Sequence, residues 1–324
     1  MSNINDLTGI QYFKNLIDLK CKYNLIDSLK KLPDSLITLD CQGNQMSFIS
    51  YFPSNLTSLE CNNNQLTSLP TLPANLSRIY CWINPLTSLP ALPSSLIDLR
   101  SANCLLTSLP IFPSYMNYLS INNNLLTSLN NLPDTVHTLD CSINHIDSLP
   151  TLPFGMEVFW CNDNLLISLP SLPSSLTQLN CTNNMITQLP TLPSTLNSLI
   201  SYNNQLIDLP TLPDTMFFLG ISGNTGITCL PPIRRIEQFY FDSTGINCLP
   251  SVISVTISYP DIDTIPVCDI INLNNCPIDW NIKGEIFSDI NSDCIQDTIE
   301  NLDAIIKMQL FENGSLIQQI FQMD

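Results

Sequence analysis

Residues 176–195 read LTQLNCTNNMITQLPTLPST, and this stretch decides the fold because its pattern returns every twenty residues along most of the chain. Its clearest marker is Asn184, which has a counterpart on nearly every turn. The counterparts are Asn24, Asn44, Asn64, Asn84, Asn124, Asn144, Asn164, Asn204 and Asn224, with Cys104 in the one remaining place. A unit this short cannot bury its own apolar side chains, so neighbouring units have to stack around one continuous core. The sequence therefore predicts a solenoid.

Each unit divides into a strand half and a proline half. The alternation around Leu179 and Cys181 predicts a short strand, and strands of successive units should form one parallel sheet. We expect the asparagine after each strand to bond backbone groups of its own turn and of the adjacent one, because buried backbone groups need partners. In the second half, Pro190 and Pro193 exclude a helix interior. They favour an extended or polyproline-like convex side.

The apolar frame also sets the predicted domain boundaries. Its turns begin near Leu16, Leu36, Leu56, Leu76, Leu96, Met116, Val136, Met156, Leu176, Leu196, Met216 and Ile236, with a compressed last turn from Val252. This predicts a solenoid of about thirteen turns over residues 16–266. Residues 1–15 are expected to form an N-terminal cap and residues 267–281 a C-terminal cap or linker. Residues 282–324 are expected to form a separate C-terminal β segment.

The proline half resembles a known class of repeat. The L-P-x-L-P unit at Leu69, Pro70, Leu72 and Pro73 is similar to the short leucine-rich repeats of secreted bacterial effectors. The L-x-C-x-x-N-x-L form resembles repeats of large bacterial surface proteins. The resemblance implies a right-handed leucine-rich repeat solenoid, with a curved parallel sheet on the concave side and no α-helices on the convex side. It also implies a platform that binds another molecule.

The same resemblance carries over no catalytic residue. Some effectors of this class have a ubiquitin-ligase domain whose nucleophile is the cysteine of a Cys-x-Asp motif. Here Cys268 is followed directly by Asp269, and fewer than sixty residues remain after it. We therefore expect no enzyme of that kind.

The thirteen cysteines divide into two groups. Those at the inward position two after the strand leucine should replace leucine as small core residues. They are Cys21, Cys41, Cys61, Cys81, Cys141, Cys161 and Cys181. Cys229 and Cys248 share one register on consecutive turns, so a bond between them is one alternative. A bridge between Cys268 and Cys276 at the C-terminal edge is the other, and Cys294 lies outside the core frame as well.

The C-terminal segment contains a candidate calcium loop, DINSDCIQDTIE. Its oxygen ligands would come from the alternate positions of an EF-hand-like loop and a final glutamate. These positions are Asp289, Asn291, Asp293, Ile295, Asp297 and Glu300. Cys294 stands where such a loop usually has glycine, which weakens the motif. The segment also resembles the start of the calcium-binding B-type repeats of bacterial adhesins, which implies a partial β-sandwich and bound Ca²⁺. The alternative is a solvated acidic loop without metal.

The outward positions of the strands are the candidate binding face. Large aromatic and arginine side chains there have no role in the core, and these residue types dominate binding hot spots. Five of them lie on three successive turns, and two lie further along the same face. They are Arg78, Tyr80, Trp82, Arg100 and Tyr118, extended by Trp160 and Tyr202. The alternative is that these side chains only stack on one another along the sheet.

An enzyme interpretation has one point in its favour. Asp40 and Glu60 fall on adjacent strands, at a spacing compatible with paired carboxylates. We place them on an exposed sheet edge, where Lys20 and Arg78 would neutralise them, so their pKa values would stay unsuited to acid catalysis. His137 and His145 have no nucleophile beside them, and we expect surface polar residues there.

Charge and composition narrow the partner further. The chain has 28 acidic and 11 basic side chains, a balance that argues against nucleic acid. No stretch is apolar enough to enter a membrane, and the N-terminus lacks a signal-peptide pattern. The leading hypothesis is a monomeric, extracellular or cell-surface binding module of a bacterium, whose signal peptide lies outside this chain and which holds a protein or glycan. The second hypothesis is an effector-like or intracellular scaffold.

Overall fold

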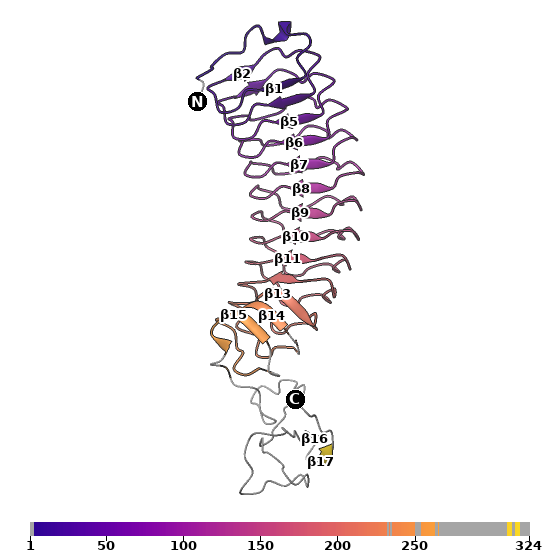
Figure 1. Cartoon of the computed structure of the whole chain (residues 1–324), viewed down its shortest axis with the longest axis vertical. Helices are drawn as coiled ribbons and strands as arrows, with labels where there is room; N and C mark the ends of the chain where they lie inside the picture. Colours follow the sequence, from indigo (N-terminus) through magenta and orange to yellow (C-terminus); the bar gives the residue numbers. More distant parts are fainter. Residues whose placement is uncertain are drawn as a thin grey trace, which may run out of the picture.

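The computed structural model of the chain is a stack of short turns along one axis (Figure 1). It describes residues 3–231, 233, 235–249, 254–262, 265, 310–312 and 315–317. One parallel sheet of thirteen strands runs along the stack, bounding about twelve turns. Its strands in order are β1 (Asp18–Lys20), β3 (Thr38–Asp40), β5 (Ser58–Glu60), β6 (Arg78–Tyr80), β7 (Asp98–Arg100), β8 (Tyr118–Ser120), β9 (Thr138–Asp140), β10 (Val158–Trp160), β11 (Gln178–Asn180), β12 (Ser198–Ile200), β13 (Thr215–Gly220), β14 (Arg235–Tyr240) and β15 (Ser254–Tyr259). The predicted solenoid with a parallel sheet is confirmed.

The period of twenty residues sets the register of the sheet. Residues twenty apart face each other across neighbouring strands, as Leu59 does with Leu39. The middle residue of each short strand is buried, and Leu179 is one example. The flanking strand residues lie on the opposite side and are called the sheet face below. Since every turn repeats this arrangement, side chains on the sheet face form straight rows along the axis.

The asparagine rungs tie each turn to the one before it. The Asn164 side-chain amide donates to the carbonyls of Cys161 (3.1 Å) and, on the preceding turn, Cys141 (3.1 Å). Its Oδ1 accepts from the N–H of Ile146 at 3.0 Å. Buried backbone groups that no strand partner reaches are thus satisfied by one side chain. The predicted structural role of the asparagines is confirmed.

The residue before each rung adopts a left-handed backbone conformation, a feature that was not predicted from the repeat. Non-glycine residues with positive φ occupy this place on nine turns: Tyr23, Asn63, Ile83, Asn103, Asn123, Ile143, Asp163, Asn183 and Asn203. Gly43 and Gly223 occupy it on two more. Asparagine, aspartate and glycine tolerate this conformation, so their recurrence before the rung was the signal. Ile83 (φ 54°) and Ile143 (φ 53°) are β-branched and strained there.

The proline half is extended and forms no α-helix in the described part of the chain. The second proline opens a tight turn, in which its carbonyl accepts from the residue three further on, as Pro173 does from the Leu176 N–H at 3.1 Å. Within the described residues, only the first two turns add a short parallel pair there, β2 (Ser28–Leu29) with β4 (Phe48–Ile49). A 3-10 helix, η1 (Ile10–Tyr12), precedes β1. A small antiparallel pair, β16 (Leu310–Glu312) with β17 (Ser315–Ile317), lies in the C-terminal segment.

The seven cysteines predicted for the core are all buried and free, and Cys104 is buried with them. Cys229 and Cys248 are disulfide-bonded. Cys268, Cys276 and Cys294 lie outside the described residues. So does the proposed calcium loop, with its residues Asp289, Asn291, Asp293, Ile295, Asp297 and Glu300.

Candidate binding surface on the sheet

Three neighbouring strands bring five of the predicted residues together. In the register of β6 to β8, Tyr80 faces Arg100 and Asp98 faces Tyr118 on the adjacent strand. Arg78 begins β6, and Trp82 follows its end by two residues. We call Arg78, Tyr80, Trp82, Arg100 and Tyr118 the aromatic–arginine cluster.

Arg100 is held at the centre of this cluster. Its Nε donates to Asp98 Oδ1 at 3.1 Å and its Nη2 to Asp98 Oδ2 at 3.2 Å. Its guanidinium carbon lies 4.6 Å from the ring centroid of Tyr80 and 4.3 Å from that of Tyr118, between cation–π partners on both sides. Partial burial lowers the pKa of Arg100, but Asp98 more than offsets this and raises it. The cation is therefore fixed before any partner arrives.

Tyr80 completes the same network. Its hydroxyl donates to Asp98 Oδ2 at 2.8 Å, and burial together with that carboxylate raises the pKa of Tyr80. The ring of Trp82 lies 5.5 Å from that of Tyr80, tilted by 41°. Tyr80, Trp82 and Tyr118 are half-buried by these contacts, whereas Arg78 is exposed. The cluster thus offers a rigid, partly covered surface, and Arg78 at its edge forms no ion pair with the residues that the structure describes.

Trp160 and Tyr202 lie on the sheet face but not in the cluster. Trp160 ends β10, where it faces Asp140 of β9. Tyr202 packs over Gly220, where an added Cβ would stand 2.5 Å from its ring. Burial raises the pKa of the Tyr202 hydroxyl to about 12. Tyr202 therefore has a packing role as well as a place on the predicted face.

Two acidic residues that were not among the predicted site residues also belong to this surface. Asp98 orients Arg100, and the signal for it was an acid two residues before an arginine on one strand. Asp140 is nearly buried and accepts from the Ser142 hydroxyl at 2.6 Å. Burial raises its pKa, which the Ser142 hydrogen bonds only partly offset. Asp140 has no cation beside it among the described residues.

The expected environment of Asp40 and Glu60 was wrong in part. They face each other across β3 and β5, as predicted. Asp40 is only 8% exposed, however, and its ion-pair partner is Lys22 at 3.2 Å, because Lys20 pairs with Asp18 instead. Burial and the Asp40 charge raise the pKa of Glu60. Its one hydrogen bond in the described structure comes from Gln42 Nε2 at 3.3 Å.

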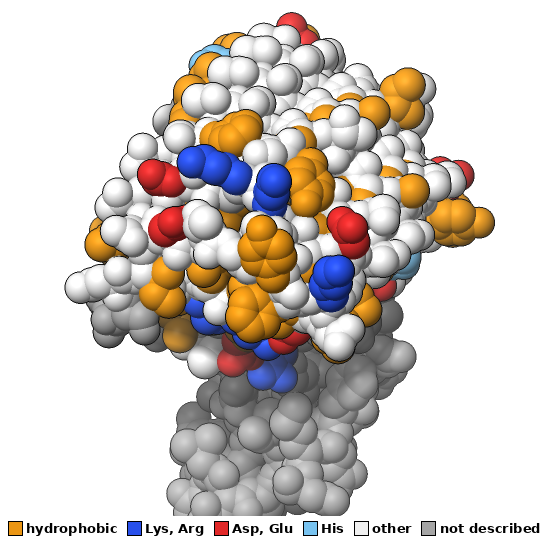
Figure 2. Space-filling model, turned by 90° about the horizontal axis from the view of Figure 1, so that it is seen from above, with side chains coloured by type: hydrophobic (Ala, Val, Ile, Leu, Met, Phe, Trp, Pro, Cys, Tyr) orange, Lys and Arg blue, Asp and Glu red, His pale blue; other side chains and the backbone are white. Residues whose placement is uncertain are grey.

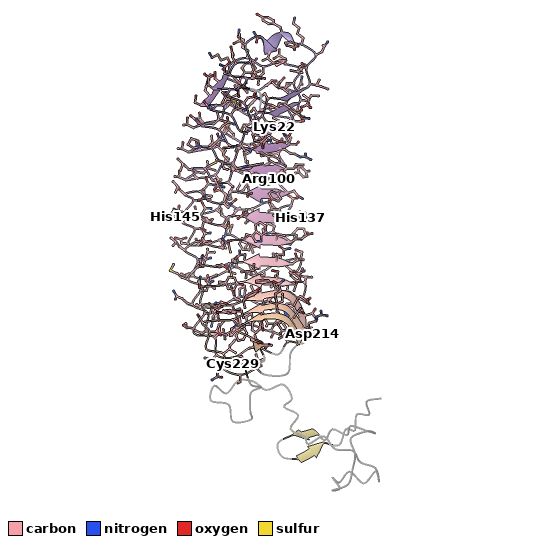
Figure 3. All side chains as sticks on the ribbon, turned by 60° about the vertical axis from the view of Figure 1, so that its left-hand side comes forward. Lys22, Arg100, His137, His145, Asp214 and Cys229 are labelled. Carbon is pink, nitrogen blue, oxygen red and sulfur yellow. The ribbon has the colours of Figure 1, made fainter. Side chains whose placement is uncertain are left out.

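The two histidines lie on opposite edges of one turn (Figure 3). His137 Nδ1 is 3.0 Å from Asn117 Nδ2 and 2.8 Å from the Thr135 carbonyl oxygen, and His145 is exposed. Figure 3 also shows Lys22 and Arg100 over the strands of the sheet. No group of three or more His, Cys, Asp or Glu suited to a metal occurs in the described ranges. Nor do these ranges contain a helix long and apolar enough to cross a membrane.

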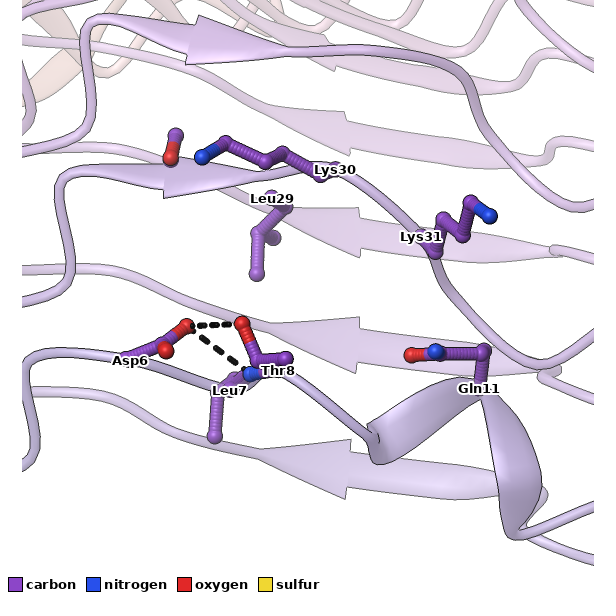
Figure 4. A pocket seen from close by; sticks show the side chains of 8 residues that line it. Asp6, Leu7, Thr8, Gln11, Leu29, Lys30 and Lys31 are labelled. Carbon is purple, nitrogen blue, oxygen red and sulfur yellow. Dashed lines mark hydrogen bonds between the residues drawn. The ribbon is translucent and has the colours of Figure 1, made fainter.

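The N-terminal end carries a second, smaller feature. A hollow of about 250 Å³ lies between the cap and the first turn, lined by Asp6, Thr8, Gln11, Lys30 and Lys31 among others (Figure 4). It is smaller than most ligand pockets. The Asp6 carboxylate is already satisfied by the Thr8 hydroxyl and N–H, both at 2.8 Å. Seen from this end, basic, acidic and apolar side chains are interspersed (Figure 2), so no strong field of one sign arises.

Comparison with solved structures identifies the fold. The chain is similar to YopM from Yersinia enterocolitica, with 31% identity and a TM-score of 0.65 over 79% of this chain and 63% of that one. It is similar to YopM from Yersinia pestis, a leucine-rich effector protein, with 24% identity and a TM-score of 0.55 over 72% and 75%. A third similar structure is the functional domain of InlJ from Listeria monocytogenes, which includes a cysteine ladder; identity is 23% and the TM-score 0.70 over 83% and 63%.

These similarities differ in what they support. The chain spans 63% of the Yersinia enterocolitica and Listeria chains, so it matches only part of each. The two matches below 25% identity show the fold alone. No protein-family model matches the sequence. A search of curated proteins likewise finds no match.

Proposed function

Because the chain is a leucine-rich repeat protein, we propose that it is a non-enzymatic module that binds another protein on its sheet face. The observation that carries the proposal is the prearranged aromatic–arginine cluster. Arg100 is fixed by Asp98 and by two rings, so little side-chain freedom is lost on binding. Tyr, Trp and Arg in such fixed positions are typical centres of protein interfaces.

The shape of the molecule supports a broad interface. Rows of side chains run along the sheet face with one position per turn, which suits recognition of an extended surface. A protein partner is therefore favoured over a small molecule, and the hollow at the N-terminal end is small for a ligand pocket. A glycan on the partner is an outcome that the experiment below distinguishes.

We place the protein outside the bacterial cell or on its surface, as a monomer. This rests on the likeness of its repeats to those of bacterial surface proteins. A second placement, as an effector-like scaffold, is favoured by the likeness of the L-P-x-L-P unit to the short repeats of secreted bacterial effectors. Both placements use the same binding face.

The binding face is tested with capture of proteins by the immobilised full chain. Proteins captured by the native chain should be lost from a Trp82→Ala, Arg100→Ala variant. Tyr118→Ala should weaken capture, whereas its matched control Tyr115→Ala should not, because Tyr115 lies in the proline half and is 70% exposed. Equal capture by all variants would refute the proposal. If the native chain binds a glycan array instead of proteins, and the same variants lose that binding, the partner is a glycan and not a protein.

A further inference from the structure

Two places on the sheet face repeat the same combination of a carboxylate and an aromatic ring. Glu60 of β5 faces Tyr80 of β6, and Asp140 of β9 faces Trp160 of β10. Both carboxylates occupy the last position of their strands, so they lie in one row along the axis. Both also have a raised pKa, because each is partly withdrawn from water.

Neither carboxylate forms an ion pair within the described part of the chain. The cations whose charges act on Glu60 are Lys20 and Lys22, which pair with Asp18 and Asp40, and Arg78, which forms no ion pair in the described structure. A carboxylate that has lost water and lacks a counterion favours an incoming cation. The residue that faces each carboxylate, Tyr80 or Trp160, carries a ring that can also bind a cation, although Arg100 already lies over the Tyr80 ring.

A buried amide beside Glu60 is a second observation that points to a ligand there. Asn62 follows Glu60 by two residues and is 4% exposed, yet its Oδ1 has no hydrogen-bond donor among the described residues. Its neighbour in the next turn is Trp82, whose carbonyl accepts from the Asn63 N–H at 2.8 Å. A buried acceptor without a donor is costly, and an arginine or lysine head group supplies N–H donors. Glu60, Asn62, Tyr80 and Trp82 are called the first subsite; Asp140, Ser142 and Trp160 are the second.

We propose that the two subsites bind two basic side chains of one extended segment of the protein partner. The inference rests on the proposed function and adds the chemistry of the partner. Four strand steps separate the subsites, or roughly 19 Å at about 4.8 Å per step. An extended chain covers that distance in about six residues at 3.3 Å each. Because six is even, side chains at i and i+6 point to the same side of such a segment.

Removal of Arg78 should change the affinity for a basic segment in the direction opposite to removal of a subsite residue. It begins β6 beside Ser58, is exposed, and has no ion pair in the described structure. Its charge lowers the pKa of Glu60 from a distance, so it competes with an incoming cation there. Removing Arg78 should therefore strengthen the binding of a basic segment, whereas removing Trp82 should weaken it.

The test uses synthetic 11-residue Gly/Ser peptides and the full chain with Trp280→Phe, so that Trp82 and Trp160 report binding by fluorescence. The peptide with arginines at i and i+6 should bind at least tenfold more tightly than one with a single arginine, because the second contact is intramolecular. Glu60→Gln and Asp140→Asn should each abolish that advantage. Arg78→Ala should increase affinity, and Asp208→Asn, which removes one exposed charge outside the sheet, should leave it unchanged.

Equal affinity for the one- and two-arginine peptides would overturn the proposal, and so would the absence of detectable binding at ~1 mM peptide. It would also be overturned if Asp208→Asn reduced the affinity for the two-arginine peptide as much as Glu60→Gln does. Circular dichroism of each variant separates loss of fold from loss of binding. The capture experiment separates failure of this inference from failure of the proposed function. If Trp82→Ala, Arg100→Ala abolishes capture of a protein that Glu60→Gln still captures, the proposed function stands and the two-cation inference fails.

Discussion

Replacing Cys104 by asparagine should stabilise the solenoid, because Cys104 is the one imperfect rung between Asn24 and Asn224. The Cys104 thiol donates weakly to the carbonyls of Cys81 (3.7 Å) and Ala102 (3.5 Å). On the other rungs an asparagine Oδ1 accepts from a backbone N–H of the preceding turn, as Asn124 does from Leu106 at 3.1 Å. The equivalent N–H, that of Leu86, has no oxygen acceptor among the described residues. Burial raises the pKa of the Cys104 thiol, and the N–H groups of Asn84 and Leu86 offset this only partly.

The size of the effect follows from the bonds gained. Cys104→Asn gives the Leu86 N–H an oxygen acceptor and replaces two weak thiol contacts by amide donors. At about 1 kcal/mol net for each hydrogen bond, and with weak sulfur contacts replaced by bonds to the amide, the gain is about 2 kcal/mol. With a urea m value of about 3 kcal/mol/M, the midpoint rises by about 0.7 M. Amide exchange at Leu86 slows by about 30-fold if the gain is local.

Two measurements test this reasoning. Urea unfolding followed by circular dichroism gives the overall change, and hydrogen exchange at Leu86 gives the local one, which matters because long repeat arrays can unfold in parts. Asn124→Cys on the next rung is the matched control and should lose a similar amount. The reasoning fails if Cys104→Asn leaves the midpoint and the Leu86 exchange rate unchanged while Asn124→Cys destabilises.

Four further predictions concern other parts of the chain. Ile83→Asn should raise the free energy of unfolding by about 1 kcal/mol in urea titrations, because φ is 54° there and asparagine tolerates a left-handed backbone; an unchanged midpoint would show that no strain exists. The Cys181 thiol, whose pKa burial raises to about 12, should resist a thiol reagent at pH ~8 until the chain is unfolded, and rapid labelling of the native protein would contradict its burial. The pKa of Asp140 is higher in the folded than in the unfolded chain, so its contribution to stability is most favourable at low pH and declines as pH rises from the unfolded pKa through the folded pKa. Asp140→Asn should flatten the dependence of unfolding free energy on pH in this range. A pH dependence identical to that of the native chain would contradict the raised pKa of Asp140. If the C-terminal loop binds Ca²⁺, Asp293→Asn should abolish the heat of calcium binding in calorimetry, whereas no heat in the native chain supports the solvated-loop alternative.

The repeat made the fold predictable. A single frame of leucine, cysteine, asparagine and proline specifies strand, core, rung and convex turn, and each prediction from that frame was tested again on every turn. Cys181 could be assigned to the core, for example, because the position two after a strand leucine has to face inward. The left-handed residue before each rung was equally present in the sequence, as recurring Asn, Asp and Gly. Its residue type varies from turn to turn, however, and includes Tyr23, Ile83 and Ile143, so it stands out less than the nearly invariant rung.

The contacts on the sheet face were less predictable, since no repeat governs them. The row positions of Tyr80, Arg100 and Tyr118 follow from the frame, but rotamers decide whether the arginine reaches a partner or folds between two rings. Here Asp98 keeps the Arg100 guanidinium between the two rings by accepting two hydrogen bonds from it. The pairing of Asp40 with Lys22 has the same origin, because Lys20 can reach Asp18 on its own strand.

The aromatic–arginine cluster and the two subsites differ in whether their charged side chains form ion pairs within the protein. Arg100 is neutralised by Asp98, so its role in binding is to present fixed aromatic area and a planar cation at low entropic cost. Glu60 and Asp140 have no ion-pair partner within the described structure, and burial raises the pKa of each. A charge kept unpaired at a cost to stability is more readily explained by binding than by folding, since the fold would gain from its removal. Replacing Asp140 by asparagine thus separates the two roles: stability at neutral pH should be kept or improved while affinity for a basic segment is lost.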